Sequence, residues 1–254
     1  MQKLRLRAAG LTDNGRKRPQ NEDAFLCDVE TGLFIVADGI GGKNAGELAS
    51  RAVVTVLPAL LRPSLASSRA SRPGSIKSAL TESLCQLSHD LYEKSKLVGT
   101  LSGLGSTAVV LVVRHGVAHL AYAGDSRAYL LRGHKLVQLT ADQTTAAALV
   151  RAGHLSPEVA ERSPLRHSLE EYIGKRSKLE PGVRSRKMQR RDRWLLCSDG
   201  VTKGLSDGVI CDALLQSPDV ETACREIVRA ANEADGSDNI TAVVIESCPS
   251  GKRA

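Results

Sequence analysis

Aromatic residues are scarce in this sequence, and long apolar runs are missing. Only 3% of the 254 residues are Phe, Trp or Tyr, so the core must be built from Ala, Val, Leu and Ile. No window approaches the roughly 18 consecutive apolar residues that a membrane span needs, and the basic segment 1–15 lacks the apolar stretch of a signal peptide. We therefore expect a cytoplasmic protein without a membrane span.

Paired metal-binding cysteines are missing too. The six cysteines are scattered with no C-x-x-C pair, which argues against structural zinc and favours ordinary buried thiols. The net charge of +7 permits contact with anions, but the basic residues are spread out and few aromatics could stack on bases, so we expect no nucleic-acid partner. The one dense basic run, 184–193, is interpreted as the solvated rim of a hairpin, with a docking surface for an acidic or phosphorylated partner as the alternative.

The first half of the sequence has a strand pattern followed by two helix patterns. Residues 33–37 are typical of a buried strand. Apolar residues then recur at helical spacing from Ala45, and the Arg-Pro pair at 62–63 predicts the end of that helix. Residues 64–75 are interpreted as a surface loop, and a second amphipathic helix is predicted over 76–97. We expect the two helices to pack as an antiparallel pair.

Short β-rich runs separated by turn residues predict an antiparallel meander over 105–140. Residues 144–178 look helical but irregular, and they are followed by further elements: a strand at 192–197, helices at 206–216 and 220–234, and a strand at 239–247. No repeat or long linker divides the chain. We expect one domain over 1–254, of the α+β class, in which two packed antiparallel sheets are flanked by helix pairs in a four-layer α-β-β-α sandwich.

Acidic residues stand at the ends of several of these strands. Asp38, Asp125 and Asp199 each follow an apolar strand, whereas Glu22–Asp23 and Asp238 each precede one. A single acid in such a place is usually a turn residue. If the strands are adjacent, however, several carboxylates converge, and their repulsion is relieved most naturally by divalent cations with oxygen ligands. The pattern therefore predicts a metal site.

The glycine-rich turn in "LFIVADGIGG" (33–42) has a competing interpretation as a phosphate-binding loop. A dinucleotide fingerprint would need glycine at 44, where Asn44 stands. A P-loop would need glycine at 37 and Ser or Thr at 44, and both positions fail. We expect instead that Gly39 lets a backbone carbonyl reach a metal and that Gly41–Gly42 allow tight passage into the helix.

Six segments together resemble, in order and spacing, the signature blocks of the metal-dependent type-2C serine/threonine protein phosphatases (the PPM family), and most of all their compact bacterial members. The segments are "RPQNEDAF", "VADGIGG", "GSTAVV", "AGDSRAYL", "LLCSDGVTKGLSD" and "GSDNITAVVI". The resemblance runs from about Leu11 to Ile245. It implies a flap-like segment at about 144–178 and a C-terminal tail at 248–254.

The resemblance also implies two Mn²⁺ or Mg²⁺ ions at one end of a β-sandwich. Asp38 would bridge both ions, with the Gly39 carbonyl on one of them. Asp199 and Asp238 would hold the first ion, and Glu22 would hold the second, largely through water. The remaining implied roles are a third metal at Asp125 with Asp199, capture of the substrate phosphate by Arg18, and support of the ligands by Asp23 and Asn239.

The implied reaction is hydrolysis of phosphoserine and phosphothreonine in proteins. Two metals would acidify a bridging water, which attacks phosphorus in line while Arg18 orients the phosphate oxygens. The expected partners are phosphorylated proteins and a cognate serine/threonine kinase, and we expect a monomer. The alternatives are a catalytically weak phosphoprotein-binding module of the same fold and a metal-dependent hydrolase of another phosphoester.

A few positions depart from the family's habits. Ile40 stands where some relatives carry a histidine proposed as general acid, so protonation of the leaving group would fall to a metal-bound water. Gln143 also replaces a common histidine, and Glu170–Glu171 occupy the flap where bacterial relatives have Thr- or Arg-like residues. These departures bear on flap contacts, substrate preference and the third metal, but they remove no core ligand.

Overall fold

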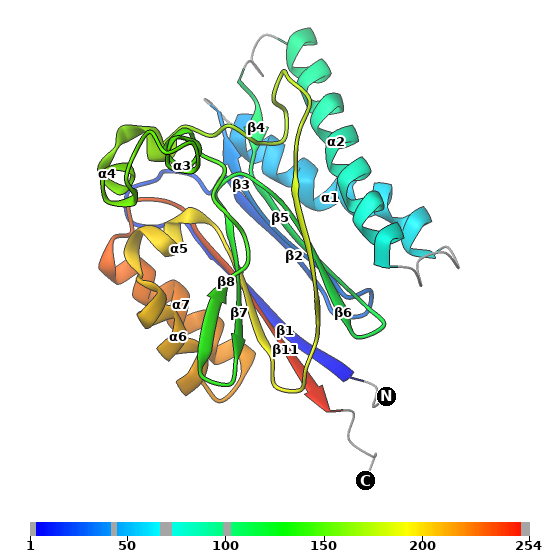
Figure 1. The fold of residues 1–254 in the computed structure, drawn as a ribbon, viewed down its shortest axis with the longest axis vertical. Coiled ribbons are helices and arrows are strands. Elements are labelled where there is room, and N and C mark those ends of the chain that lie inside the picture. The colour runs from blue at the N-terminus through cyan, green and yellow to red at the C-terminus, as the bar shows by residue number, and fades with distance from the viewer. Residues whose placement is uncertain (1–3, 42–44, 67–72, 99–102, 250–254) are drawn as a thin grey trace.

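The computed structural model describes residues 4–41, 45–66, 73–98 and 103–249. Two antiparallel sheets pack face to face, and helices cover both outer faces (Figure 1). The first sheet has the strand order β1-β11-β10-β7-β8 and the second the order β2-β3-β5-β6-β9, with β4 paired to β3. The expected four-layer sandwich of the α+β class is confirmed.

The strands of the first sheet are β1 (Leu4–Asp13), β7 (Arg127–Arg132), β8 (Lys135–Gln138), β10 (Arg193–Cys197) and β11 (Ile240–Pro249). Those of the second are β2 (Asp23–Asp28), β3 (Leu33–Ile40), β4 (Gly105–Ser106), β5 (Ala108–Arg114), β6 (Val117–Ala123) and β9 (Gly182–Lys187). The inner faces bury a shared core that includes Phe34, Leu111 and Trp194. Strand β1 was not predicted, and β9 lies where only a basic rim was expected.

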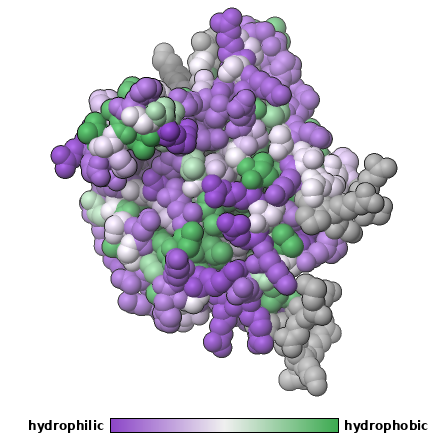
Figure 2. Space-filling view, viewed as in Figure 1, coloured by the Kyte–Doolittle hydropathy of each residue, from purple (hydrophilic) through white to green (hydrophobic). Residues whose placement is uncertain are grey.

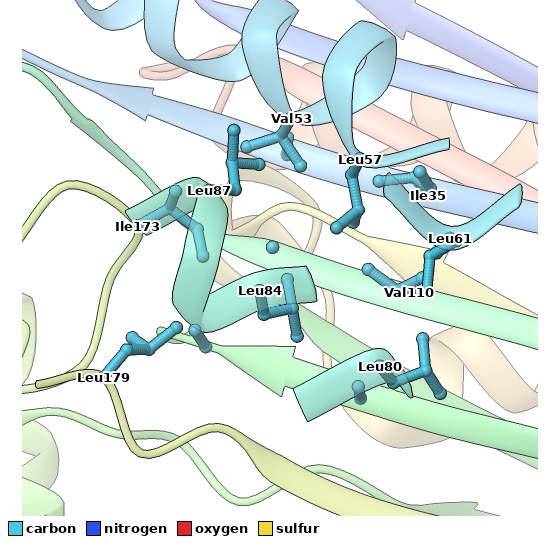
Figure 3. Packing of buried hydrophobic residues seen from close by; sticks show 14 of the residues in the cluster. Ile35, Val53, Leu57, Leu61, Leu80, Leu84, Leu87, Val110, Ile173 and Leu179 are labelled. Atoms are coloured by element: carbon cyan, nitrogen blue, oxygen red, sulfur yellow. The ribbon is translucent and has the colours of Figure 1, made fainter. Parts of the chain in front are cut away.

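Helices α1 (Ala45–Ala66) and α2 (Pro73–Leu97) cover the second sheet. Figure 3 shows Val53 and Leu57 of α1 and Leu84 of α2 packed with Ile35 of β3, and all four side chains are buried. By length and composition alone, α1 could cross a membrane, but here its apolar stripe lies in this core. The prediction that the helix ends at Arg62-Pro63 was wrong, because a proline in the last turn removes only one backbone hydrogen bond.

Helices α5 (Asp199–Gly204), α6 (Asp207–Gln216) and α7 (Val220–Ala234) cover the first sheet. The last two begin and end as the sequence predicts. Helix α6 is capped at its N-terminus by Ser206, whose hydroxyl accepts a hydrogen bond from the Val209 amide. Helix α5 was not predicted, and it begins on the acidic residue Asp199.

The expected meander over 105–140 is divided between the two sheets. Strands β5 and β6 form a hairpin in the second sheet, whereas β7 and β8 form a hairpin in the first. The connection 124–126 crosses from one sheet to the other, beginning at Gly124, whose φ of 106° suits glycine. Apolar alternation indicates a strand but not the sheet that it joins, so the sequence pattern could not show this crossing.

The expected flap-like segment folds into α3 (Thr145–Arg151), α4 (Pro157–Arg162) and a 3₁₀ turn (Pro164–His167) at one end of the sandwich (Figure 1). Figure 2 shows a largely hydrophilic surface with scattered apolar patches, one of them over this segment. Val159 and Leu165 are among its exposed apolar side chains. The 184–193 run has a different surface: its exposed side chains are basic, and they lie on β9 and the turn after it.

Strand β11 continues to Pro249 and pairs with β1 along its whole length. Cys248 and Pro249, expected in the tail, therefore belong to the sheet, and residues 250–254 lie outside the described part. Within its sheet β11 lies between β1 and β10. The residues just before β11 are consequently held next to both the first strand and the strand that precedes α5.

Candidate metal-binding active site

The strand-end acids lie at the same end of the sandwich and come from both sheets. In the second sheet, Asp38 in β3 pairs directly with Asp23 in β2, and Asp125 follows β6. In the first sheet, Asp199 follows β10 and Asp238 precedes β11. Antiparallel pairing explains the convergence, because one strand's end lies beside its neighbour's start. The convergence expected from the sequence is thus present in the fold.

The crowding of these carboxylates changes their acidity. Burial raises the pKa of Asp38 well above its ordinary value, and the charges of Asp23, Asp199, Asp125 and Asp238 raise it further. Burial and the neighbouring Asp199 raise the pKa of Asp125 to about 7. The cluster therefore carries a negative potential that favours a cation at this end of the molecule.

Asp23 links the two sheets. Its Oδ2 accepts hydrogen bonds from Ser198 Oγ, directly after β10, and from Thr241 Oγ1 in β11, both at 2.7 Å. Its Oδ1 is buried and has no hydrogen-bond partner in the described residues. Burial raises the pKa of Asp23 to about 7, although the two hydroxyls oppose this shift. These contacts tie the start of β2, which pairs with Asp38, to the residues of the first sheet.

Asn239 holds the loop that carries Glu22. Its Oδ1 accepts a hydrogen bond from the Glu22 amide at 2.8 Å, and its Nδ2 donates to the carbonyls of Asn14 and Gln20. Burial raises the pKa of Glu22, and the charge of Arg18 opposes the shift. Asn239 therefore positions the backbone of Glu22.

Gly39 lies where the backbone of three segments meets. Its amide donates to the Glu22 carbonyl at 3.1 Å, and a Cβ added at Gly39 would stand 2.2 Å from the Gly46 carbonyl oxygen at the start of α1. No side chain fits there, so α1 can approach β3, the strand that carries Asp38, closely. The next turn uses Gly41 at φ 147°, and Gly42 lies outside the described residues.

The Ser106–Thr107 pair of "GSTAVV" anchors the peptide of Asp38. The Thr107 amide and the Ser106 hydroxyl both donate to the Asp38 carbonyl, at 2.8 and 3.0 Å. Thr107 Oγ1 accepts from the Asp38 amide and also bonds the Ser126 hydroxyl in the loop of Asp125. These two residues, not predicted as site residues, connect Asp38 in β3 to the loop of Asp125 and fix the spacing of the two acids.

Two cations lie against the acids. Lys203 Nζ is 2.5 Å from Asp199 Oδ2 and 2.7 Å from Asp238 Oδ2. Arg18 Nε is 2.9 Å from Asp238 Oδ1. Burial alone would raise the pKa of Asp238, but its hydrogen bond with Lys203 and the two positive charges lower it. Sequence reasoning missed Lys203; the available signal was its position one helical turn after Asp199.

Two of the unusual residues have structural contacts. Gln143 Oε1 accepts from the Gly124 amide at 2.9 Å, and its backbone amide donates to the Gly124 carbonyl, so it fixes the turn that carries Asp125. Glu171 pairs with Lys175 at 2.6 Å and accepts from the Glu180 amide. Both residues therefore stabilise the base of the flap. Ile40 ends β3 opposite Gly105.

The acids suit hard divalent cations in chemistry. They offer carboxylate oxygens, and Asp199 Oδ1 as well as Asp23 Oδ1 is buried with no hydrogen-bond partner among the described residues. Over the described ranges, no three acidic, histidine or cysteine side chains are already arranged to ligate one ion together. Lys203 occupies the space between two of the candidate ligands. The donor set thus fits Mn²⁺ or Mg²⁺, but binding requires side-chain rearrangement.

A cleft of about 840 Å³ opens beside the acids, between the flap and α5. Its lining includes Asp125, Asp199 and Lys203 on one side and the flap residues Arg162 and His167 on the other. Asp125 and Asp199 are therefore reachable from solvent through this cleft.

Comparisons with known proteins agree with this geometry. The sequence profile of protein phosphatase 2C matches residues 13–244. The serine/threonine protein phosphatase PstP of Mycobacterium tuberculosis is 32% identical over 244 residues, which cover 96% of this chain and 45% of that protein. The serine/threonine phosphatase stp of Listeria monocytogenes is 32% identical, with 92% of this chain and 93% of that protein covered.

A solved structure of the PstP catalytic domain in complex with two manganese ions is 31% identical, covers 97% of this chain and 100% of that chain, and superposes with a TM-score of 0.77. The described chain spans about half the length of the mycobacterial relative and nearly all of the Listeria one. The chain belongs to the protein phosphatase 2C family of metal-dependent serine/threonine phosphatases.

Proposed function

We propose that this protein hydrolyses phosphoserine and phosphothreonine in other proteins, with Mn²⁺ or Mg²⁺ as cofactor. The observation that carries the proposal is the convergence of Asp38, Asp125, Asp199 and Asp238 from two sheets at one end of the sandwich, where Asp125 and Asp199 line an open cleft. Family membership supports the same activity. The alternative of a catalytically weak binding module is not favoured, because every expected carboxylate is retained.

Each acid has a proposed role in holding two ions. Asp38 would contribute to both sites and the Gly39 carbonyl to one of them, Asp199 and Asp238 would hold the first ion, and Glu22 would hold the second. When bound, such ions act as Lewis acids and supply a nucleophile derived from water near neutral pH. A third ion is assigned to Asp125 with Asp199, whose charge raises the pKa of Asp125.

The chain's own residues position the substrate. Arg18 lies at the rim of the site with its side chain 49% exposed, so its guanidinium can turn toward a phosphate and donate two parallel hydrogen bonds. Asp23, Asn239 and Thr107 hold the ligand backbones in place. The opposing partner is proposed to be a serine/threonine kinase, and the place of action the cytoplasm.

The test is hydrolysis of a phosphothreonine peptide with added Mn²⁺. Asp38→Asn should lower kcat at least about 100-fold, because it removes the charge proposed to bridge both ions. Asp212→Asn, on the exposed face of α6, is the matched control and should keep wild-type turnover. Equal turnover in Asp38→Asn and wild type would refute the metal assignment. Cleavage of nucleic acid but not of the phosphopeptide would refute the proposed substrate class.

A further inference from the structure

Lys203 contacts two of the acids that are proposed to hold the first metal. It lies on α5 one turn after Asp199, and its Nζ is 2.5 Å from Asp199 and 2.7 Å from Asp238. Its side chain is 21% exposed, so the ammonium is largely withdrawn from water. Asp199 begins α5 after β10 and Asp238 precedes β11, so the ion pairs of Lys203 join two separate segments.

Arg18 does not duplicate this arrangement. Within the described part of the chain its guanidinium forms an ion pair with Asp238 but with no other acid, and its side chain, which comes from a loop, is 49% exposed. Lys203 is held by a helix whose backbone is fixed beside α7. A cation in this place satisfies the oxygens that a divalent ion would use, and a positive charge left close to such an ion repels it.

We propose that Lys203 is an internal competitor of the first metal ion and sets the affinity of the site. The inference rests on the proposed function, which assigns Asp199 and Asp238 to that ion. Metal binding displaces the ammonium from the two carboxylates, and the flexible four-carbon stem allows this movement. The displaced side chain has space in the cleft that it already lines, between α5 and the flap.

Competition of this kind has two linked consequences. In chelator-containing buffer the Lys203 ion pairs stabilise the protein by neutralising crowded carboxylates. In the presence of metal the same ion pairs must be broken, so they weaken binding. A lysine with only a structural role would give the first effect without the second.

The test is titration of the purified protein with Mn²⁺ alone, followed by calorimetry, together with melting temperatures in EDTA. Lys203→Met should bind Mn²⁺ more tightly, on the order of tenfold, and should melt at a lower temperature than wild type in EDTA. Lys203→Arg keeps a cation and should bind like wild type. Lys175→Met is the matched control, because it removes a lysine paired at the same spacing to Glu171, with a side chain 11% exposed.

Tighter binding in Lys203→Met alone supports the proposal. If Lys203→Met binds Mn²⁺ no more tightly than wild type, the proposal is overturned. It is also overturned if Lys203→Arg or Lys175→Met gains as much affinity for Mn²⁺, because the gain would then come from side-chain shape or from the net charge of the protein. If neither wild type nor Lys203→Met binds Mn²⁺, the proposed metal site itself fails. Failure of the Lys203 proposal can be told from failure of the metal site, because only in the former case does wild type still bind Mn²⁺.

Discussion

Replacing Asp23 by asparagine should stabilise the protein at alkaline pH, although the native carboxylate accepts two hydrogen bonds. Burial raises the pKa of Asp23 to about 7, against about 3.9 in an unfolded chain. A shift of about three units corresponds to about 4 kcal/mol of unfolding free energy. Asparagine keeps the shape, and its amide can still bond the hydroxyls of Ser198 and Thr241.

The sign follows from the raised pKa. Below about pH 3 the carboxyl is protonated in both the folded and the unfolded wild type, so it has no pH-dependent effect on stability. As the pH rises toward 7, the unfolded chain ionises first, so the folded wild type loses stability relative to Asp23→Asn. About 2.5 kcal/mol of this loss should fall between pH 5 and pH 8. Urea unfolding in EDTA at both values measures the difference between the two proteins.

Asp28→Asn, at the other end of the same strand, is the control, because the pKa of Asp28 is shifted in the opposite direction. Hydrogen bonds from the Thr31 hydroxyl and amide lower the pKa of Asp28, so its removal should bring no gain at pH 8. If the stability difference between wild type and Asp23→Asn is the same at pH 5 and pH 8, the carboxylate is not destabilised by burial. The interpretation of Asp23 as a costly buried charge would then be wrong.

Two further substitutions test close packing and a buried ion pair. Gly39→Ala should destabilise the fold by at least about 2 kcal/mol and abolish phosphatase activity, because the added Cβ would lie 2.2 Å from the Gly46 carbonyl oxygen. Gly208→Ala is the control: its added Cβ would lie 3.8 Å from the Ser206 hydroxyl oxygen, so this variant should melt like wild type. Arg132→Met should cost about 3 to 5 kcal/mol in urea unfolding, because it leaves the buried Asp192 without its bidentate partner. A cost below about 1 kcal/mol would show that other groups neutralise Asp192.

The sequence predicts the acids of the site because each follows or precedes a recognisable strand. Asp38 ends an apolar run, and "WLLC" precedes Asp199. Lys203, whose positive charge pairs with two of these acids, was not predicted. Lys203 stands in an ordinary helical position, and its contact with Asp238 depends on how α5 lies beside the start of β11. Such a contact is tertiary, and no local pattern reports it.

The fold shows the same division between local and tertiary information. Helices α6 and α7 were predicted with correct bounds, because caps and helical periodicity are local signals. The separation of β6 and β7 into different sheets was not predicted, since both are apolar strands that could pair in either sheet. The edge strand β9 was hidden for another reason: its exposed basic residues mask the alternation that marks a strand.

The interior place of β11 in its sheet, between β1 and β10, has a consequence for synthesis of the chain. Residues of β11 arrive more than two hundred positions after β1, with which they pair, and Asp238 stands immediately before them. A nascent chain that lacks this strand has exposed edges on β1 and β10 and cannot assemble the acid cluster. Incomplete chains on the ribosome should therefore have no phosphatase activity, and the activity should begin only when β11 inserts between its two neighbours.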